Sequence, residues 1–174
     1  RSCLVGSEMC IRDSVYTCDI FDQSSLDFVV KNQVNVNMGT VDMIHQYGQA
    51  NPERKGITLR INPGFGHGHS QKTNTGGPSS KHGIWFEELN HAIEAAAKYN
   101  LSITGIHMHI GSGTDFEHLT KVCSAMEETA KKVGSGVTMI SAGGGLPIPY
   151  KKDQGRIDIQ KLSLIHISEP TRQD

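Results

Sequence analysis

Short apolar runs alternate with amphipathic stretches between Val15 and Gln160, and this alternation constrains the fold more than any other feature. Strands are expected at the five apolar runs, residues 15–20, 34–38, 57–61, 103–110 and 137–142. Successive strands joined through single helices imply right-handed crossovers and a parallel sheet. The residues therefore predict an α/β domain, either an open doubly wound sheet or part of a (β/α)8 barrel.

Several residues mark where the expected helices begin and end. Ser24 or Ser25 is expected to cap the first helix, and Thr40 the second, which would stop at Gly48. Thr114–Glu117 has the form of a capping box for the last helix. The two longer helices have apolar stripes that we expect to be buried: Leu89, Ala92, Ile93, Ala96 and Ala97 in one, and Phe116, Leu119, Cys123, Met126, Ala130 and Val133 in the other.

Charge and composition limit the partners of the chain. Its 174 residues include 17 Lys+Arg and 18 Asp+Glu, a formal net charge of -1, which argues against a nucleic-acid-binding domain. No apolar run approaches the ~20 residues needed to cross a bilayer. The four cysteines form neither a C-x-x-C pair nor a dense disulfide pattern. We therefore expect a cytoplasmic protein without nucleic-acid or membrane partners.

The two ends of the chain differ in character from the middle. Residues 1–14 have no continuous apolar core and no small-residue cleavage site, so they are not a signal peptide. They resemble the translation of a sequencing adapter, as does the stretch Leu162–Arg172. We expect residues 1–14 and 161–174 to be non-native, residues 15–160 to form the domain, and the natural protein to be longer on both sides.

Two histidines stand near the end of the fourth expected strand. A period of two places His107 and His109 on one face and Ile106, Met108 and Ile110 on the other. The apolar side chains are expected to face the helices, so the histidines face the barrel interior or the sheet crevice. They could be hydrogen-bonded core residues, metal ligands, proton-transfer groups, or rings that stack on a flat cofactor.

Arg60 follows the same alternation in the third strand, where it shares the polar face with Thr58 and Asn62. An inward arginine needs an anionic or hydrogen-bonding partner, because it cannot lose its charge. That partner could be a ligand or a carboxylate of the barrel.

Glycine-rich turns follow two successive strands. Gly143, Gly144 and Gly145 come directly after the fifth strand, and Gly111–Gly113, which contains Ser112, follows the fourth. Backbone amides in such turns can approach a phosphate closely. Because both turns lie at the carboxyl ends of strands in one sheet, we expect them to converge on a single site.

The stretch from Asn62 to His82 is expected to be a long loop, and a loop of that length in a compact domain is usually functional. It contains His67, His69 and His82, together with Lys72 and Lys81. Loop histidines are usually solvated, so these residues are not predicted to form a metal site.

Four segments resemble, in order and spacing, the pyridoxal-phosphate decarboxylases with an alanine-racemase-like barrel, which act on diaminopimelate, ornithine or arginine. The segments are Leu59–Gly64, the loop Gly66–His69 continuing to Ser80–Gly83, His107–Ser112, and Ser141–Leu146. The loop favours the diaminopimelate branch. The resemblance covers essentially all of residues 15–160 and implies a partial (β/α)8 barrel with about five parallel strands.

The resemblance also implies roles for individual residues. Pyridoxal 5'-phosphate would be the cofactor, with His109 stacked on its ring and with Ser112 and the turn Gly143–Gly145 at its phosphate. Arg60 would lie near the pyridine side of the ring, and Lys81 near a subunit contact of a homodimer. No metal ligand is implied.

The implied reaction removes carbon dioxide from the D-centre of meso-2,6-diaminopimelate and yields L-lysine, the last step of lysine biosynthesis. Three family features have no counterpart in this sequence: the Schiff-base lysine in its Y-A-x-K-A-N-like motif, an E-P-G-R-like segment, and the second, β-rich domain. Lys72 and Lys81 lie in other motifs and do not replace that lysine. We therefore expect the chain by itself to be an inactive fragment.

Two other hypotheses remain open at this point. His107 and His109 could be an H-x-H ligand pair of a metal-dependent barrel hydrolase, which would need further ligands at later strand ends. The chain could also be a non-catalytic pseudoenzyme that binds pyridoxal phosphate without the lysine.

Overall fold

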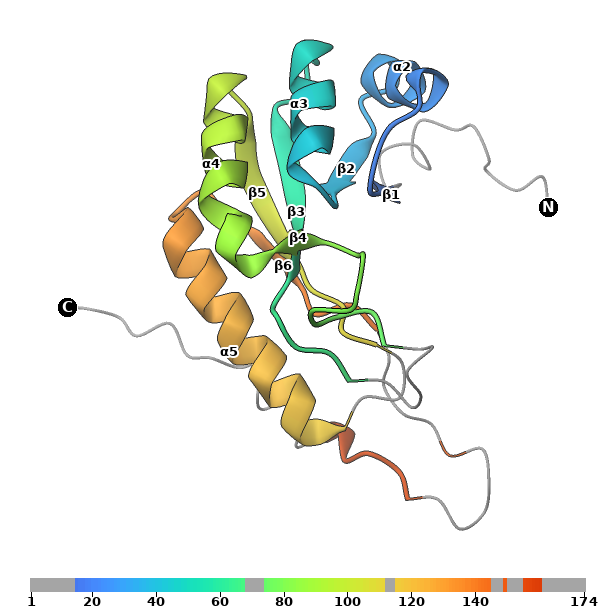
Figure 1. Cartoon of the computed structure of the whole chain (residues 1–174), viewed down its shortest axis with the longest axis vertical. Helices are drawn as coiled ribbons and strands as arrows, with labels where there is room; N and C mark the ends of the chain where they lie inside the picture. Colours follow the sequence, from blue (N-terminus) through green and yellow to red (C-terminus); the bar gives the residue numbers. More distant parts are fainter. Residues whose placement is uncertain (1–14, 68–73, 112–114, 145–148, 150–154, 161–174) are drawn as a thin grey trace.

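The computed structural model describes residues 15–67, 74–111, 115–144, 149 and 155–160 (Figure 1). The segments 1–14 and 161–174 therefore lie outside the described residues. The elements are β1 Val15–Cys18, α2 Gln23–Lys31, β2 Asn35–Met38, α3 Val41–Gln49, β3 Gly56–Asn62, β4 Ile84–Trp85, a 3-10 turn at Phe86–Glu88, α4 Leu89–Lys98, β5 Ser102–His107, α5 Phe116–Val133 and β6 Met139–Ser141.

The strands form a parallel sheet in the order β1-β2-β3-β5-β6, with the short strand β4 paired to the end of β3. The order follows the sequence and does not reverse, as in a (β/α)8 barrel and unlike a doubly wound sheet. The predicted α/β fold with five main parallel strands is confirmed. The sequence analysis missed β4, which lies at the end of the expected loop.

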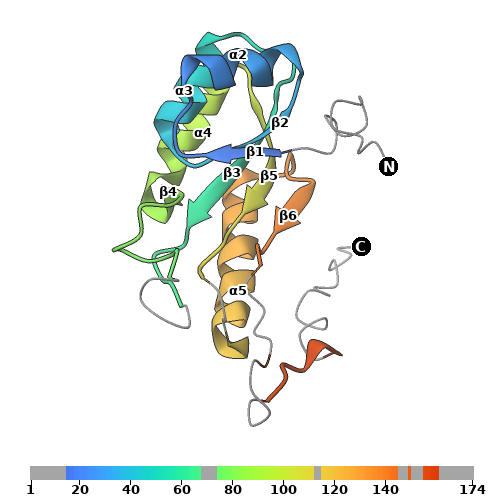
Figure 2. The same cartoon turned by 90° about the vertical axis from the view of Figure 1, so that its right-hand side faces the viewer.

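Helices cover one face of the sheet. Figures 1 and 2 show α2, α3 and α4 side by side, with the long helix α5 beneath them. The predicted alternation is confirmed, because Ile57, Leu59 and Ile61 of β3 are buried in the core. In and after β5, Ile106, Met108 and Ile110 are buried in the same way. The polar residues between them therefore point to the opposite face.

The helix that follows β1, α2, begins two or three residues earlier than predicted. Its N-cap is Asp22, whose carboxylate accepts from the backbone N–H of Ser25 at 2.9 Å. The hydroxyls of Ser24 and Ser25 donate to the same carboxylate. The prediction of a serine cap was wrong because a carboxylate accepts several bonds at once, and the serines act here as donors.

Of the other two predicted caps, one lies where expected and the other lies one residue later in the chain. Thr40 caps α3 as predicted, and its hydroxyl accepts from the N–H of Met43 at 3.1 Å. Helix α5 is capped by Asp115, which accepts from the N–H of His118 at 2.9 Å. The expected capping box is therefore displaced by one residue, and its Thr114 lies outside the described residues.

Gly48 does not stop α3, which continues to Gln49. A Cβ atom at Gly48 would lie 2.2 Å from Cγ of Tyr99, so glycine is required there by the tyrosine ring. Gly48 therefore allows α3 to pack closely against the end of α4. The prediction that it stops the helix was wrong.

The buried stripes of the longer helices are shifted from those predicted. In α4 the buried face includes Ala95, whereas Ala97 is exposed, because the face centres on Ala92 and Ala96. In α5 the fully buried residues are Leu119, Val122, Met126 and Thr129. Cys123, expected in the core, is only half-buried.

Within the described ranges, no helix is both long enough and apolar enough to span a membrane.

Candidate functional site

The candidate site lies at the carboxyl ends of the strands, on the face opposite the helices. Arg60 in β3 pairs in register with His107 in β5, which pairs with Ser141 in β6. The parallel arrangement therefore brings the residues that follow β5 and β6 to one end of the sheet. His109 and the turn Gly143–Gly144 lie there.

His107 is held inside the sheet by a residue of β2, the strand that β3 separates from β5. The side-chain amide nitrogen of Asn37, at the end of β2, lies 2.7 Å from Nδ1 of His107 and donates to it. Burial, followed by the positive charge of Arg60 and the His109 ring, lowers the pKa of His107 to about 4. His107 is therefore a neutral, hydrogen-bonded residue. This agrees with the first alternative given for the two histidines, a hydrogen-bonded core residue.

His109 contacts the glycine turn directly. The backbone N–H of Gly144 donates to its Nδ1 at 3.3 Å, and the Thr75 hydroxyl donates to its carbonyl oxygen at 3.1 Å. Burial lowers the pKa of His109, and the charge of Arg60 adds to the effect. The ring is thus a neutral imidazole whose Nδ1 is an acceptor, and its proton lies on Nε2.

The glycine turn fits against this histidine. Gly143 has φ 72°, and a Cβ atom there would lie 2.8 Å from both Cβ and Nδ1 of His109. At Gly144 a Cβ atom would have no neighbour within 4 Å, so there is open space beside the turn. The turn after β6 therefore lies against His109, whereas the predicted convergence of this turn with Gly111–Gly113 stays a prediction, because Gly113 is not among the described residues. Ser112 and Gly145 lie outside the described residues.

Arg60 is half-buried on the polar face. Burial lowers the pKa of Arg60, and the negative charge of Asp19 opposes that change. Asp19 follows β1, and Oδ2 of its carboxylate lies 3.3 Å from Nδ1 of His82. The loop thus returns to the site through His82, and the charge of Asp19 acts on Arg60 from the end of β1.

Sequence reasoning missed two residues of this site, Asp19 and Asn37. Both stand at the carboxyl end of a strand, as Arg60 and His109 do. Asn37 is only 5% exposed, and its Oδ1 has no hydrogen-bond partner among the described residues. Applying the strand-end argument to the first two strands would have found both.

The predicted loop histidines separate in the structure. His82 joins the site through Asp19, and His67 lies beside Asp115 and His118 at the start of α5. Lys81 is exposed. His69 and Lys72 lie outside the described residues. In the described part of the chain, three side chains able to hold a metal gather at His67, Asp115 and His118, and no such group forms around His107 and His109.

Comparison with known families decides between these possibilities. Residues 6–168 match the family described as pyridoxal-dependent decarboxylase, pyridoxal binding domain. The chain belongs to this family. The resemblance seen in the four sequence segments is confirmed, and the partial barrel corresponds to the pyridoxal binding domain that describes this family.

Individual members of the family are close in sequence. The diaminopimelate decarboxylase of Escherichia coli (strain K12) is 49% identical over 148 residues, which cover 85% of this chain and 35% of that protein. The enzyme of the same name from Streptomyces coelicolor is 46% identical over 147 residues, covering 84% of this chain and 33% of that protein. The chain thus spans about a third of the length of these relatives.

Solved structures agree with this assignment. A crystal structure of diaminopimelate decarboxylase superposes with a TM-score of 0.81 at 47% identity, covering 88% of this chain and 36% of that one. The diaminopimelate decarboxylase of Helicobacter pylori, crystallised with L-lysine, has a TM-score of 0.71 at 20% identity, covering 87% of this chain and 40% of that one, and supports the fold alone.

Proposed function

We propose that the chain is a segment of a diaminopimelate decarboxylase that uses pyridoxal 5'-phosphate to convert meso-2,6-diaminopimelate to L-lysine and carbon dioxide. The observation that carries the proposal is the contact between Nδ1 of His109 and the N–H of Gly144, in a chain 49% identical to a named diaminopimelate decarboxylase. This contact joins His109, proposed to stack on the pyridoxal ring, to the glycine turn that is proposed to bind the cofactor phosphate.

The described residues fit such a cofactor. The open space at Gly144 leaves room for an anion beside the turn, and Gly143 keeps that turn close to His109. A neutral imidazole can lie against a flat aromatic ring without bringing a second charge to it. The buried Oδ1 of Asn37, without a partner in the described region, is an acceptor that a bound group or a water can satisfy.

Each residue then has a defined task in the reaction. His109 positions the ring of the cofactor, and Gly143, Gly144 and Gly145 with Ser112 bind its phosphate. Arg60 keeps its positive charge at the pyridine side, where Asp19 balances it. The bound cofactor supplies an electron sink for the carbanion that forms when carbon dioxide leaves. Asn37 holds His107 neutral behind this site.

The properties of the whole protein follow as part of the same proposal. The catalytic lysine and the second domain would lie in sequence beyond this chain, and residues 1–14 and 161–174 would be adapter-derived. The enzyme would be a cytoplasmic homodimer that binds a small amino acid and no nucleic acid, with Lys81 near the subunit contact. The exposure of Lys81 is compatible with that place.

The test uses the full-length enzyme that contains this segment, loaded with pyridoxal phosphate. Release of L-lysine from meso-diaminopimelate is measured for the wild type, for His109→Ala, and for His91→Ala as a control. His91 is exposed on α4 and pairs with Glu88, away from the site. We expect His109→Ala to lower kcat/KM by about 10²-fold, because the ring is then no longer positioned, and His91→Ala to leave it unchanged.

Two results would contradict the proposal. A full-length protein that binds pyridoxal phosphate and releases no L-lysine would be a pseudoenzyme or would act on another amino acid. A protein that binds no pyridoxal phosphate would refute the cofactor as well as the reaction.

A further inference from the structure

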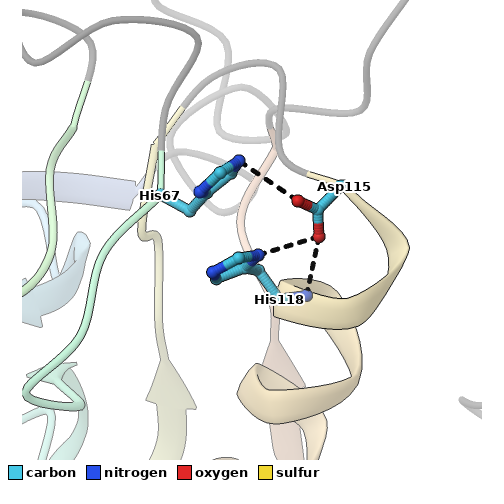
Figure 3. Close-up of side chains that lie close together, drawn as sticks. All are labelled: His67, Asp115 and His118. Atoms are coloured by element: carbon cyan, nitrogen blue, oxygen red, sulfur yellow. Dashed lines mark hydrogen bonds and ion pairs between the residues drawn. The ribbon is translucent and has the colours of Figure 1, made fainter.

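Three side chains outside the proposed cofactor site form a compact His–Asp–His cluster, His67, Asp115 and His118 (Figure 3). Nε2 of His67 lies 3.2 Å from Oδ2 of Asp115, and Nδ1 of His118 lies 2.8 Å from Oδ1. The two imidazole rings are stacked, with centroids 3.9 Å apart and an interplanar angle of 15°. One candidate ligand atom from each residue lies within 4.8 Å of the others.

This donor set suits a late divalent metal ion such as zinc. Imidazole nitrogen and carboxylate oxygen bind zinc at roughly 2.0–2.2 Å, so two ligands of one tetrahedral ion lie roughly 3.3–3.5 Å apart. The 3.2 Å between His67 and Asp115 is close to that separation.

The backbone holds these ligands in place before any ion arrives. The N–H of His67 donates to the carbonyl oxygen of Ile110 at 3.2 Å, which fixes the loop against the end of β5. Asp115 is the N-cap of α5, and its Oδ1 accepts from the backbone N–H of His118. The hydrogen bond from the N–H of His118 lowers the pKa of Asp115, so its carboxylate is ionised and oriented.

The cluster is also accessible. The side chains of His67, Asp115 and His118 are 37%, 51% and 26% exposed. An ion bound there would keep open positions for water, as a three-ligand site does. The cluster lies next to the segment His109–Gly111, beside the candidate cofactor site but separate from it.

We propose that His67, Asp115 and His118 bind one zinc-class divalent cation, which ties the loop after β3 to the start of α5. Sequence analysis did not predict this site, because its ligands are separated along the chain and only the fold brings His67 to the helix. Metal binding here is independent of the decarboxylase reaction. The ion would act as a structural link at the mouth of the barrel.

The experiment titrates the full-length, metal-free protein with Co²⁺ and with Zn²⁺, and follows the visible Co²⁺ spectrum and its displacement by Zn²⁺. Three variants remove one ligand each: His67→Gln, His118→Gln and Asp115→Asn. Asparagine is also a good N-cap, so Asp115→Asn removes the charge and keeps the helix start. His91→Gln is the matched control, since Nδ1 of His91 lies 2.8 Å from the Glu88 carboxylate and the pair lacks a third ligand.

We expect one Co²⁺ per chain in the wild type and in His91→Gln, and at least about tenfold weaker binding in each of the three ligand variants. Zn²⁺ should also raise the Tm of the wild type and not that of Asp115→Asn. Failure of the wild type to bind either ion overturns the proposal and leaves Asp115 as a helix cap that hydrogen-bonds two histidines. Undiminished binding in the ligand variants overturns it too, because the ion is then held elsewhere.

Discussion

The histidines of this chain have different environments, and the environment decides what each one can do. His107 is enclosed in the sheet, where burial and the charge of Arg60 oppose a second positive charge. His91 lies on the surface, where the Glu88 carboxylate favours protonation and raises its pKa. Two residues of the same type are thus set apart by burial in one case and by a carboxylate in the other.

This contrast predicts the order in which the histidines take up protons. In a pH titration followed by NMR of the imidazole C–H signals, His91 should protonate above pH 6.5 and His107 only near pH 4. Because the unfolded chain protonates His107 near 6.5, the unfolded state binds more protons between about pH 6.5 and 4. The contribution of His107 to stability therefore falls as the pH is lowered through that window. A His107 signal that moves at or above pH 6.5 would show that the residue is not buried as described.

Gly143 and Gly144 make a second prediction at the residue scale. Gly143→Ala forces a side chain into a left-handed conformation and against His109, so we expect it to cost about 1–3 kcal/mol in urea denaturation. Gly144→Ala meets open space and should change the free energy of unfolding by less than about 0.5 kcal/mol. Equal effects of the two substitutions would mean that the turn does not lie against His109.

At the scale of elements, helix α3 is joined to the strand-end loop of β1 by one side chain. The hydroxyl of Thr40 accepts from the N–H of Met43 and donates to the carbonyl oxygen of Asp19 at 2.8 Å. The start of α3 therefore also fixes the backbone of Asp19, whose negative charge acts on Arg60. A helix cap thus supports the position of a charge in the candidate site.

Substitution of Thr40 tests this link. Thr40→Ala should lower the free energy of unfolding by about 1–2 kcal/mol, because it removes both hydrogen bonds of the hydroxyl. Thr40→Ser keeps the hydroxyl and should lie within about 0.5 kcal/mol of the wild type. Urea denaturation of the three proteins provides the measurement. A Thr40→Ser protein as unstable as Thr40→Ala would assign the effect to the lost methyl group.

The contact between α3 and the end of α4 gives a prediction whose sign is unusual. Gly→Ala inside a helix normally stabilises by up to about 1 kcal/mol. Gly48→Ala should instead destabilise by about 1–3 kcal/mol, because the new methyl group would overlap the ring of Tyr99. In a Tyr99→Ala background the same change should be neutral or stabilising. A Gly48→Ala protein with a higher Tm than the wild type would contradict this packing.

Sequence patterns located the strands well and the helix ends less well. Alternation along β3 and β5 follows from the pleat, so the inward positions of Arg60 and His109 could be predicted from the chain alone. The caps at Asp22 and Asp115 could not, because several neighbouring polar residues can each accept the same N–H. Gly48 was misinterpreted because its reason, the ring of Tyr99, is a tertiary contact that no local pattern contains.

On the scale of the whole molecule, the described sheet has two outer strands, β1 and β6. Three large apolar side chains of these strands are about half exposed: Val15, Met139 and Ile140. Unpaired edges with exposed apolar residues favour association with other chains. The part of the barrel that is proposed to bind the cofactor therefore has exposed edges that favour association with other chains.

The 174-residue chain expressed by itself should consequently elute as large assemblies in size-exclusion chromatography with light scattering. Ile140→Lys should reduce this association by adding a charge to the edge of β6. The chain should release no L-lysine from meso-diaminopimelate with added pyridoxal phosphate, because it lacks the family's lysine motif. A monomer that melts cooperatively and produces L-lysine would contradict both expectations.

The sequential strand order also has a consequence for how such a domain is made. Each strand pairs with the strand before it in the sheet, so β1 and β2 can associate as soon as β2 has left the ribosome. The pairing of β5 with β3 comes later, since its two strands are separated by the loop, β4 and α4. Closing a longer stretch of chain costs more entropy, so this pairing is the slowest local step in the synthesis order. The segment that contains His67 and His82 must thus be synthesised before β5 can pair with β3.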